Sequence, residues 1–194
     1  MPPRSNLKLK FKHRQQQGFT LLEVLVVLVV IGILAAIAAP NWLSLSNNQK
    51  LISAQTLAIS SLRQAQSNSK RDQISWQTSF RNMSDRSQYA IHRTPVLSET
   101  TADYWNNLPW VNFDSGVRIV ENTESQPRTT FTKLSAIPNP AVYRVQFTPK
   151  GLPNGLGEMG RITLAVDSSP RRRCVIISTI LGTMRTAENS DCNQ

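Results

Sequence analysis

Glu23 is the most unusual residue of the sequence, because it is the only charged residue within the apolar run from Phe19 to Ala39. A carboxylate costs about 2.5–3.5 kcal/mol at the centre of a bilayer, and less near the interface. Acidic residues in membrane-length segments are therefore functional by default and pair with a polar or cationic group. We expect Glu23 to find such a partner in the working protein.

The sequence offers few side chains that could take part in catalysis. The chain has two histidines and two cysteines, too few for a four-cysteine zinc site. His13 lies near the N-terminus and His92 has no evident partner, so we predict an ordinary surface or half-buried histidine at position 92. Residues 155–160 match G-x-G-x-x-G, but a strand pattern follows where the dinucleotide motif requires a helix, which indicates a hairpin loop. We predict no catalytic residue, no metal, no cofactor and no enzymatic activity.

Arginines gather in the C-terminal part of the sequence. Arg171, Arg172 and Arg173 are consecutive, and Arg185 follows. Arginines can contact nucleic-acid phosphates, but no aromatic residues are interleaved with these. A solvated turn, or a salt bridge to a neighbouring subunit, explains the triple arginine equally well.

Cys174 and Cys192 are the only cysteines, and both lie in the C-terminal part. In an oxidising compartment they can form a disulfide, which would tie the C-terminal tail to a sheet. The chain-entropy model gives such a bond roughly 3 kcal/mol of stabilisation. Two free thiols are the alternative.

A basic leader precedes the apolar run. The chain has 22 Lys and Arg against 12 Asp and Glu, a net charge of +10, and the first 18 residues contain no acid. Their basic residues are Arg4, Lys8, Lys10, Lys12 and Arg14. At about 1.5 Å per residue the apolar run spans roughly 31 Å as a helix, the thickness of a hydrocarbon core. The positive-inside rule then places the leader in the cytoplasm and the C-terminal part across the membrane.

A secretory signal peptide is an alternative for this segment, since residues 36–38 form an A-x-A cleavage site. The apolar run is longer than the usual h-region of about 7–15 residues, and no polar segment precedes Ala36. Pro40 also follows the alanines closely. These features favour a retained helix over a cleaved one.

The helix is expected to continue as far as residues 67–69, with a kink at Pro40, which lacks an amide hydrogen. Its predicted buried stripe repeats at three- and four-residue steps, at Leu51, Ile52, Gln55, Ala58, Ile59, Leu62 and Ala65. Beyond residue 70 the period becomes strand-like. The best strands are predicted at 141–148, 161–167 and 173–179, with weaker ones at 74–80 and 89–92, in one small antiparallel sheet.

The segment QQQGFTLLEVLVVLVVIGILAAIAAP resembles the N-terminus of type IV pilins and pseudopilins. The resemblance implies that a prepilin peptidase cuts after Gly18 and that Phe19 becomes an N-methylated terminus. Glu23 would then be the acid at the fifth mature position, serving filament assembly by pairing with the Phe19 amine of a neighbouring subunit. Pro40 falls where many pilins have a helix-kinking proline.

The run from Val145 to Glu188 resembles the C-terminal half of the GspH/FimT pseudopilin family. The matching features are Phe147, Gly151 and the strands at 162–166 and 175–178. Some members of that family end in a Gly-Arg-x-Arg tail that binds DNA during natural transformation. Here the corresponding run is 182–185, Gly-Thr-Met-Arg, which lacks one of the two arginines.

The sequence thus predicts an α+β, pilin-like fold with a basic leader (1–18), an assembly helix (19–39), its amphipathic continuation (40–69) and a β-rich domain (70–194). The expected function is that of a structural subunit of a type IV pilus or a type II secretion pseudopilus. Its expected partners are other pilins, the prepilin peptidase and the inner membrane, which it crosses once with its N-terminus in the cytoplasm. The alternatives are a DNA-binding minor pilin and a domain released or anchored after signal-peptidase cleavage.

Overall fold

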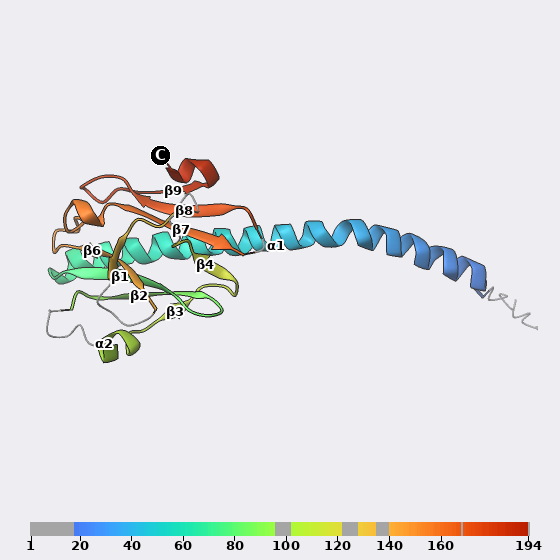
Figure 1. The fold of residues 1–194 in the computed structure, drawn as a ribbon, viewed down its shortest axis with the longest axis horizontal. Helices are drawn as coiled ribbons and strands as arrows, with labels where there is room; N and C mark the ends of the chain where they lie inside the picture. The colour runs from blue at the N-terminus through green and yellow to red at the C-terminus, as the bar shows by residue number, and fades with distance from the viewer. Residues whose placement is uncertain (1–17, 96–101, 122–127, 135–139, 168, 194) are drawn as a thin grey trace, which may run out of the picture. The chain divides into compact units, whose positions relative to one another are not determined.

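The computed structural model describes residues 18–95, 102–121, 128–134, 140–167 and 169–193. The predicted leader up to residue 17 lies outside this set, as do the side chains of residues 38–41. The chain divides into two compact units, one ending at Trp42 and one running from Leu43 to Gln194. Helix α1, Leu21–Asp72, contributes residues to both units (Figure 1). Pro40 falls inside α1, and its role as a kink stays a prediction.

Helix α1 begins directly after Thr20. The Thr20 side chain accepts a hydrogen bond from the Glu23 backbone N–H (3.2 Å), and its carbonyl accepts one from the Val24 N–H (3.2 Å). A threonine followed three residues later by a glutamate is the capping-box pattern of a helix N-terminus. Local sequence therefore fixes the start of the helix immediately after the Gly18–Phe19 boundary.

The helix ends at Asp72, beyond the predicted end at residues 67–69. Ser69 does not stop the helix, because its hydroxyl donates to the Gln66 carbonyl (2.8 Å) and so stays compatible with helical backbone. Lys70 and Arg71 in the last turn complement the negative end of the helix dipole. Gln73 then adopts a φ of 55°, the left-handed conformation that commonly follows a helix.

The described strands form two antiparallel sheets, where the sequence predicted one. The five-stranded sheet has the order β3-β2-β1-β6-β5, and the four-stranded sheet has the order β4-β7-β8-β9. The five-stranded sheet consists of β1 (Trp76–Asn82), β2 (Ser87–Arg93), β3 (Val111–Asn112), β5 (Thr132–Leu134) and β6 (Val142–Phe147). The four-stranded sheet consists of β4 (Val117–Ile119), β7 (Gly160–Val166), β8 (Arg172–Ile177) and β9 (Met184–Glu188). The prediction failed here because β4 pairs with β7, from a distant part of the chain, and not with β3.

Among the described residues, two short helical elements lie between strands, and a third follows the last strand β9. They are α2 (Ala102–Asn106), the 3-10 turn η2 (Leu156–Glu158) and the 3-10 turn η3 (Asn189–Asn193). The glycine-rich segment 155–160 contains η2 and leads directly into β7, so it is followed by a strand, as predicted.

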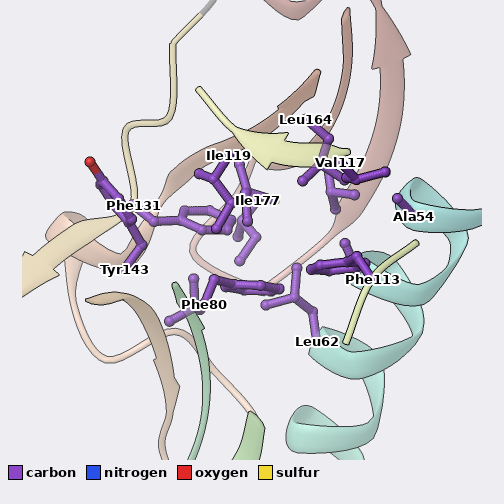
Figure 2. Close-up of a cluster of buried hydrophobic side chains, with 14 of the residues drawn as sticks. Ala54, Leu62, Phe80, Phe113, Val117, Ile119, Phe131, Tyr143, Leu164 and Ile177 are labelled. Atoms are coloured by element: carbon purple, nitrogen blue, oxygen red, sulfur yellow. The ribbon is translucent and has the colours of Figure 1, made fainter. Parts of the chain in front are cut away.

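The core of the larger unit lies between both sheets and the second part of α1, around which the strands gather in Figure 1. Small side chains such as Ala54, Ala58 and Ala65 are completely buried and let the helix approach the strands closely. Figure 2 shows Leu62 of α1 and Phe80 of β1 pointing into one cluster. The predicted stripe was wrong at Ile52, whose side chain is exposed.

Candidate assembly helix and candidate basic site

The first part of α1 presents an apolar surface on all sides. Every large apolar side chain from Phe19 to Ile37 is between 47% and 83% exposed. The most apolar window of α1 has a mean hydropathy of 3.1, and none of it is buried in the structure. A helix that is apolar all round belongs in lipid or among other helices. By length and composition, α1 can cross a membrane.

Gly18 and Phe19 precede this helix in an exposed stretch of chain without regular secondary structure. A Cβ atom added at Gly18 would meet no atom within 4 Å, so packing within the chain does not require glycine here. The peptide bond between Gly18 and Phe19 is therefore open to another protein.

Glu23 shares a face of α1 with Val27, because residues four apart lie above one another on a helix, and Phe19 lies beside them just before the helix begins. Together with Val24 and Leu28 they line a hollow of about 250 Å³, in which Glu23 is the charged residue. Among the ion pairs of the described residues, none involves the Glu23 carboxylate. Within the part of the chain that the structure describes, the apolar surface thus carries one carboxylate without an ion-pair partner.

The structure separates the arginines that the sequence grouped. Arg173 pairs with Glu188 (2.9 Å) and donates to the Gln55 side chain (3.2 Å). Arg172 donates to the Ser169 carbonyl (2.9 Å) and the Arg171 carbonyl (3.1 Å). Two of the consecutive arginines therefore form contacts within the domain.

A polar groove of about 380 Å³ brings two of the four arginines together. It is lined by Gln55, Arg173, Arg185, Thr186, Ala187, Glu188 and Asp191. Arg171 and Arg172 do not line it. Because Glu188 and Asp191 contribute negative charge to the same groove, its electrostatics are mixed and poorly suited to a phosphate backbone.

Cys174 and Cys192 form a disulfide, with Cα atoms 5.9 Å apart. Both residues are completely buried. The bond ties η3 to β8, and Arg161 donates to the Cys192 carbonyl (2.6 Å). The expected attachment of the C-terminal tail to a sheet is thus present.

The prediction for His92 was wrong, because this side chain is buried in a polar network. Its Nε2 lies 2.9 Å from the Ser79 hydroxyl and 3.3 Å from the Gln77 amide, and its Nδ1 lies 2.8 Å from the Tyr104 hydroxyl. Burial, with a smaller contribution from the positive charge of Arg144, lowers the pKa of His92 to about 4, and the hydrogen bond to the Arg93 carbonyl offsets only part of this shift. Ser79 is completely buried, so this serine–histidine pair is closed to a substrate.

Sequence reasoning missed this network because its members come from β1, β2 and α2, which are separated along the chain. It also missed the capping role of Thr20, although the spacing of Thr20 and Glu23 was a readable signal. Among the described residues, no group of three or more His, Cys, Asp or Glu side chains is placed to hold a metal ion.

Comparison with known proteins identifies the N-terminal segment. Residues 13–39 match the prokaryotic N-terminal methylation motif. Type II secretion system core protein G of Pseudomonas aeruginosa is 48% identical to this chain over 40 residues, which cover 21% of this chain and 28% of that protein. The protein of the same name from Vibrio cholerae is 62% identical over 32 residues, covering 16% of this chain and 22% of that protein.

The aligned segments thus span about a quarter of these relatives, and no solved structure matches the chain. The chain is a pilin-like protein that carries the prepilin-type methylation motif, on an α+β fold with a long N-terminal helix and antiparallel sheets. The resemblance of its C-terminal half to the GspH/FimT family stays a prediction.

Proposed function

We propose that this chain is a minor pilin or pseudopilin, a structural subunit of a type IV pilus or a type II secretion pseudopilus. The observation that carries the proposal is the first part of α1, an exposed apolar surface within the methylation motif, whose single carboxylate forms no ion pair with another described residue. In this role the protein acts through helix packing and not through catalysis.

The proposed life cycle begins in the inner membrane. The basic leader stays in the cytoplasm and α1 crosses the bilayer, which places the domain on the opposite side. A prepilin peptidase cuts after Gly18, and Phe19 is methylated. The disulfide of the domain suits an exported location, because such bonds persist in oxidising compartments.

Assembly then supplies the missing partner of Glu23. In a filament of packed helices, water is excluded and the carboxylate can pair with the cationic amine of Phe19 on a neighbouring subunit. The alternative role for Glu23 is a favourable interaction with the positive end of its own helix. That interaction is worth only about 0.3–1 kcal/mol at exposed sites, less than the cost of placing the charge in an apolar environment.

Mass spectrometry of the membrane-bound protein tests the processing step. We expect a mature chain that starts with N-methylated Phe19. A mature chain that starts at Ala39 would contradict the proposal and indicate ordinary secretion.

Two glycine variants make this test specific to the cleavage site. Gly18→Val should block cleavage, although the folded chain has room for the new side chain. Gly32→Ala is the control, because that glycine also has open space around its Cβ position but lies within α1, away from the cleavage site. We expect the Gly32 variant to be processed normally, so equal cleavage of both variants would count against recognition of Gly18.

A further inference from the structure

Two loops of the domain carry aliphatic side chains where polar residues are usual. Thr179–Gly182 form a tight turn between β8 and β9, closed by a hydrogen bond from the Gly182 N–H to the Thr179 carbonyl (2.9 Å). The central residues of this turn are Ile180 and Leu181, which are 64% and 68% exposed. Asn, Asp, Gly, Ser and Pro dominate such positions. The turn therefore exposes two large aliphatic side chains that its own conformation does not need.

The second loop precedes β7 and exposes a third aliphatic side chain. Leu156, at the start of η2, is 73% exposed and lies between Gly155 and Gly157. The chain around it is shaped by Gly155, which has a φ of 94°. Here too, an exposed leucine occupies a glycine-rich turn that does not require it.

The same part of α1 holds both loops in place. The Gln66 side chain donates to the Gly151 carbonyl (2.8 Å) and to the Gly182 carbonyl (3.5 Å). A Cβ atom added at Gly182 would lie 3.2 Å from the Pro153 ring, so the loops are in contact. Leu156 lies in the same β6–β7 connection as Gly151 and Pro153, so Leu156, Ile180 and Leu181, which we call the aliphatic cap, come from two adjoining loops near the C-terminal end of α1.

The exposed charges beside the aliphatic cap are positive. Lys150 is exposed, and the exposed Lys70 lays its hydrocarbon stem over Gly151. Of the nearby acids, Asp72 is paired with Arg71 (2.8 Å), and Glu158 is buried, with its carboxylate accepting a hydrogen bond from the Gln146 N–H (3.1 Å). Neither acid offsets the two lysines.

We propose that the aliphatic cap inserts into the surface of a lipid bilayer with anionic headgroups, with Lys70 and Lys150 at the level of the lipid phosphates. Aliphatic tips next to basic residues are the pattern by which proteins bind the membrane interface, and long lysine stems let the charge stay in the headgroup layer.

The size of the aliphatic cap favours lipid over a protein partner. Burying one aliphatic side chain removes on the order of 100 Å² from water, so the cap offers roughly 300 Å². A specific protein interface takes about 800 Å² from each partner. Insertion into a fluid interface needs no complementary surface, so a small group of side chains is enough.

The test uses the full chain, anchored by its own helix in neutral phosphatidylcholine vesicles. Separate fluorescent acceptor vesicles contain phosphatidylcholine with or without phosphatidylglycerol. We measure how much acceptor the protein-bearing vesicles capture. We expect capture of the anionic acceptors, weakening as salt is raised, and little capture of neutral ones.

Three variants separate the contributions. Leu156→Ser, Ile180→Ser and Leu181→Asn combined should reduce capture by about tenfold or more, and these polar residues suit turns, so the fold should persist. Met83→Ser is the matched control, because Met83 is also an exposed apolar residue beside a strand end, and it should leave capture unchanged. Lys70→Gln with Lys150→Gln should weaken capture of anionic acceptors selectively.

Three outcomes would overturn the proposal. The first is unchanged capture after the triple substitution, and the second is equal capture of neutral and anionic acceptors. The third is that the protein binds labelled duplex DNA instead of vesicles, and that this binding depends on the lysines but not on the aliphatic cap. The last outcome would assign the surface to nucleic acid. Because vesicle capture needs no filament, its failure would leave the proposed assembly role untouched.

Discussion

The two parts of α1 differ in how far the rest of the chain buries their apolar side chains. From Phe19 to Ile37 the large apolar side chains are exposed, whereas Leu51 and Leu62 farther along are completely buried by the domain. The first part uses bulky Leu, Val and Ile all round, and the second uses a narrow stripe rich in alanine. One helix thus serves two environments, and the amino-acid choice changes where the environment changes.

The polar residues of the two parts differ in the same way. Gln55 is buried, but its amide donates to the Cys174 and Ala187 carbonyls (2.9 Å each) and accepts from Arg173 (3.2 Å). Glu23 lies on an apolar surface with no ion pair among those of the described residues. Gln55 is thus part of the hydrogen bonding of the fold, whereas the Glu23 carboxylate is available for the intersubunit pairing proposed above.

The largest effect should come from removing the unsatisfied carboxylate. We expect Glu23→Ala to be inserted and cleaved but to enter filaments at least 100-fold less well, since breaking a buried ion pair costs about 3–5 kcal/mol. Immunoblotting of sheared filaments against the membrane fraction measures this. Gln55→Ala is the comparison, because it should lower domain stability and leave helix packing unaffected. Normal incorporation of Glu23→Ala would show that the acid has no role in assembly.

Two leucines in α1 test whether burial divides the helix as the structure indicates. Leu62→Ala should lower the free energy of unfolding of the domain by about 2–5 kcal/mol, because it leaves a cavity in a packed core. Leu28→Ala, in the exposed part, should leave that free energy unchanged. Denaturant unfolding of the detergent-solubilised chain, followed by tryptophan fluorescence, distinguishes the two. A similar loss in both variants would mean that the two parts are not independent.

The sequence predicted the helical parts of this molecule better than the arrangement of its strands. The apolar run and the small-residue stripe at Ala58 and Ala65 are local patterns, so they are visible without tertiary contacts. Strand β9 was not predicted, because Met184–Glu188 shows no alternation of apolar and polar residues. It is a strand through its pairing with β8. The division into two sheets depends on the pairing of β4 with β7, which no local pattern encodes.

The candidate sites follow the same rule. Gly18, Phe19 and Glu23 lie within six residues of sequence, so their motif is visible without the structure. The disulfide was predictable because two cysteines allow only one intramolecular pairing. The four arginines were grouped by sequence proximity, but alternation along β8 and the acceptors Glu188 and Gln55 separate them in space. His92 appeared isolated because its partners are brought to it only by folding.

Acid should destabilise the domain through His92. Its pKa is lowered from 6.5 to about 4 in the folded protein, so between these values the unfolded chain binds the proton more readily. The stabilisation from neutral His92 is therefore fully present above pH 6.5 and is lost as the pH falls towards 4, by up to about 3 kcal/mol. Melting temperatures across this range should fall less steeply in His92→Gln than in the unsubstituted chain. Parallel pH profiles would contradict the assignment.

The smallest effect is expected from the arginines in a DNA-binding assay. Each phosphate contact adds about 0.9 to the slope of log affinity against log salt on duplex DNA. Arg172, Arg173 and Arg185 all form side-chain contacts within the domain, but only Arg171 and Arg185 have exposed side chains, which makes these two the more accessible candidates.

We therefore expect weak binding of duplex DNA by the detergent-solubilised full chain. Replacing Arg171 and Arg185 with alanine should flatten the slope by at most about 2. Arg173→Ala is the contrasting variant, because it removes the cation facing Glu188 and should lower stability more than DNA binding. Gel-shift titrations at several salt concentrations measure both slopes. Tight binding that loses 3–4 units of slope only when all four arginines are replaced would mean that they act as one surface, and would favour a DNA-capturing minor pilin.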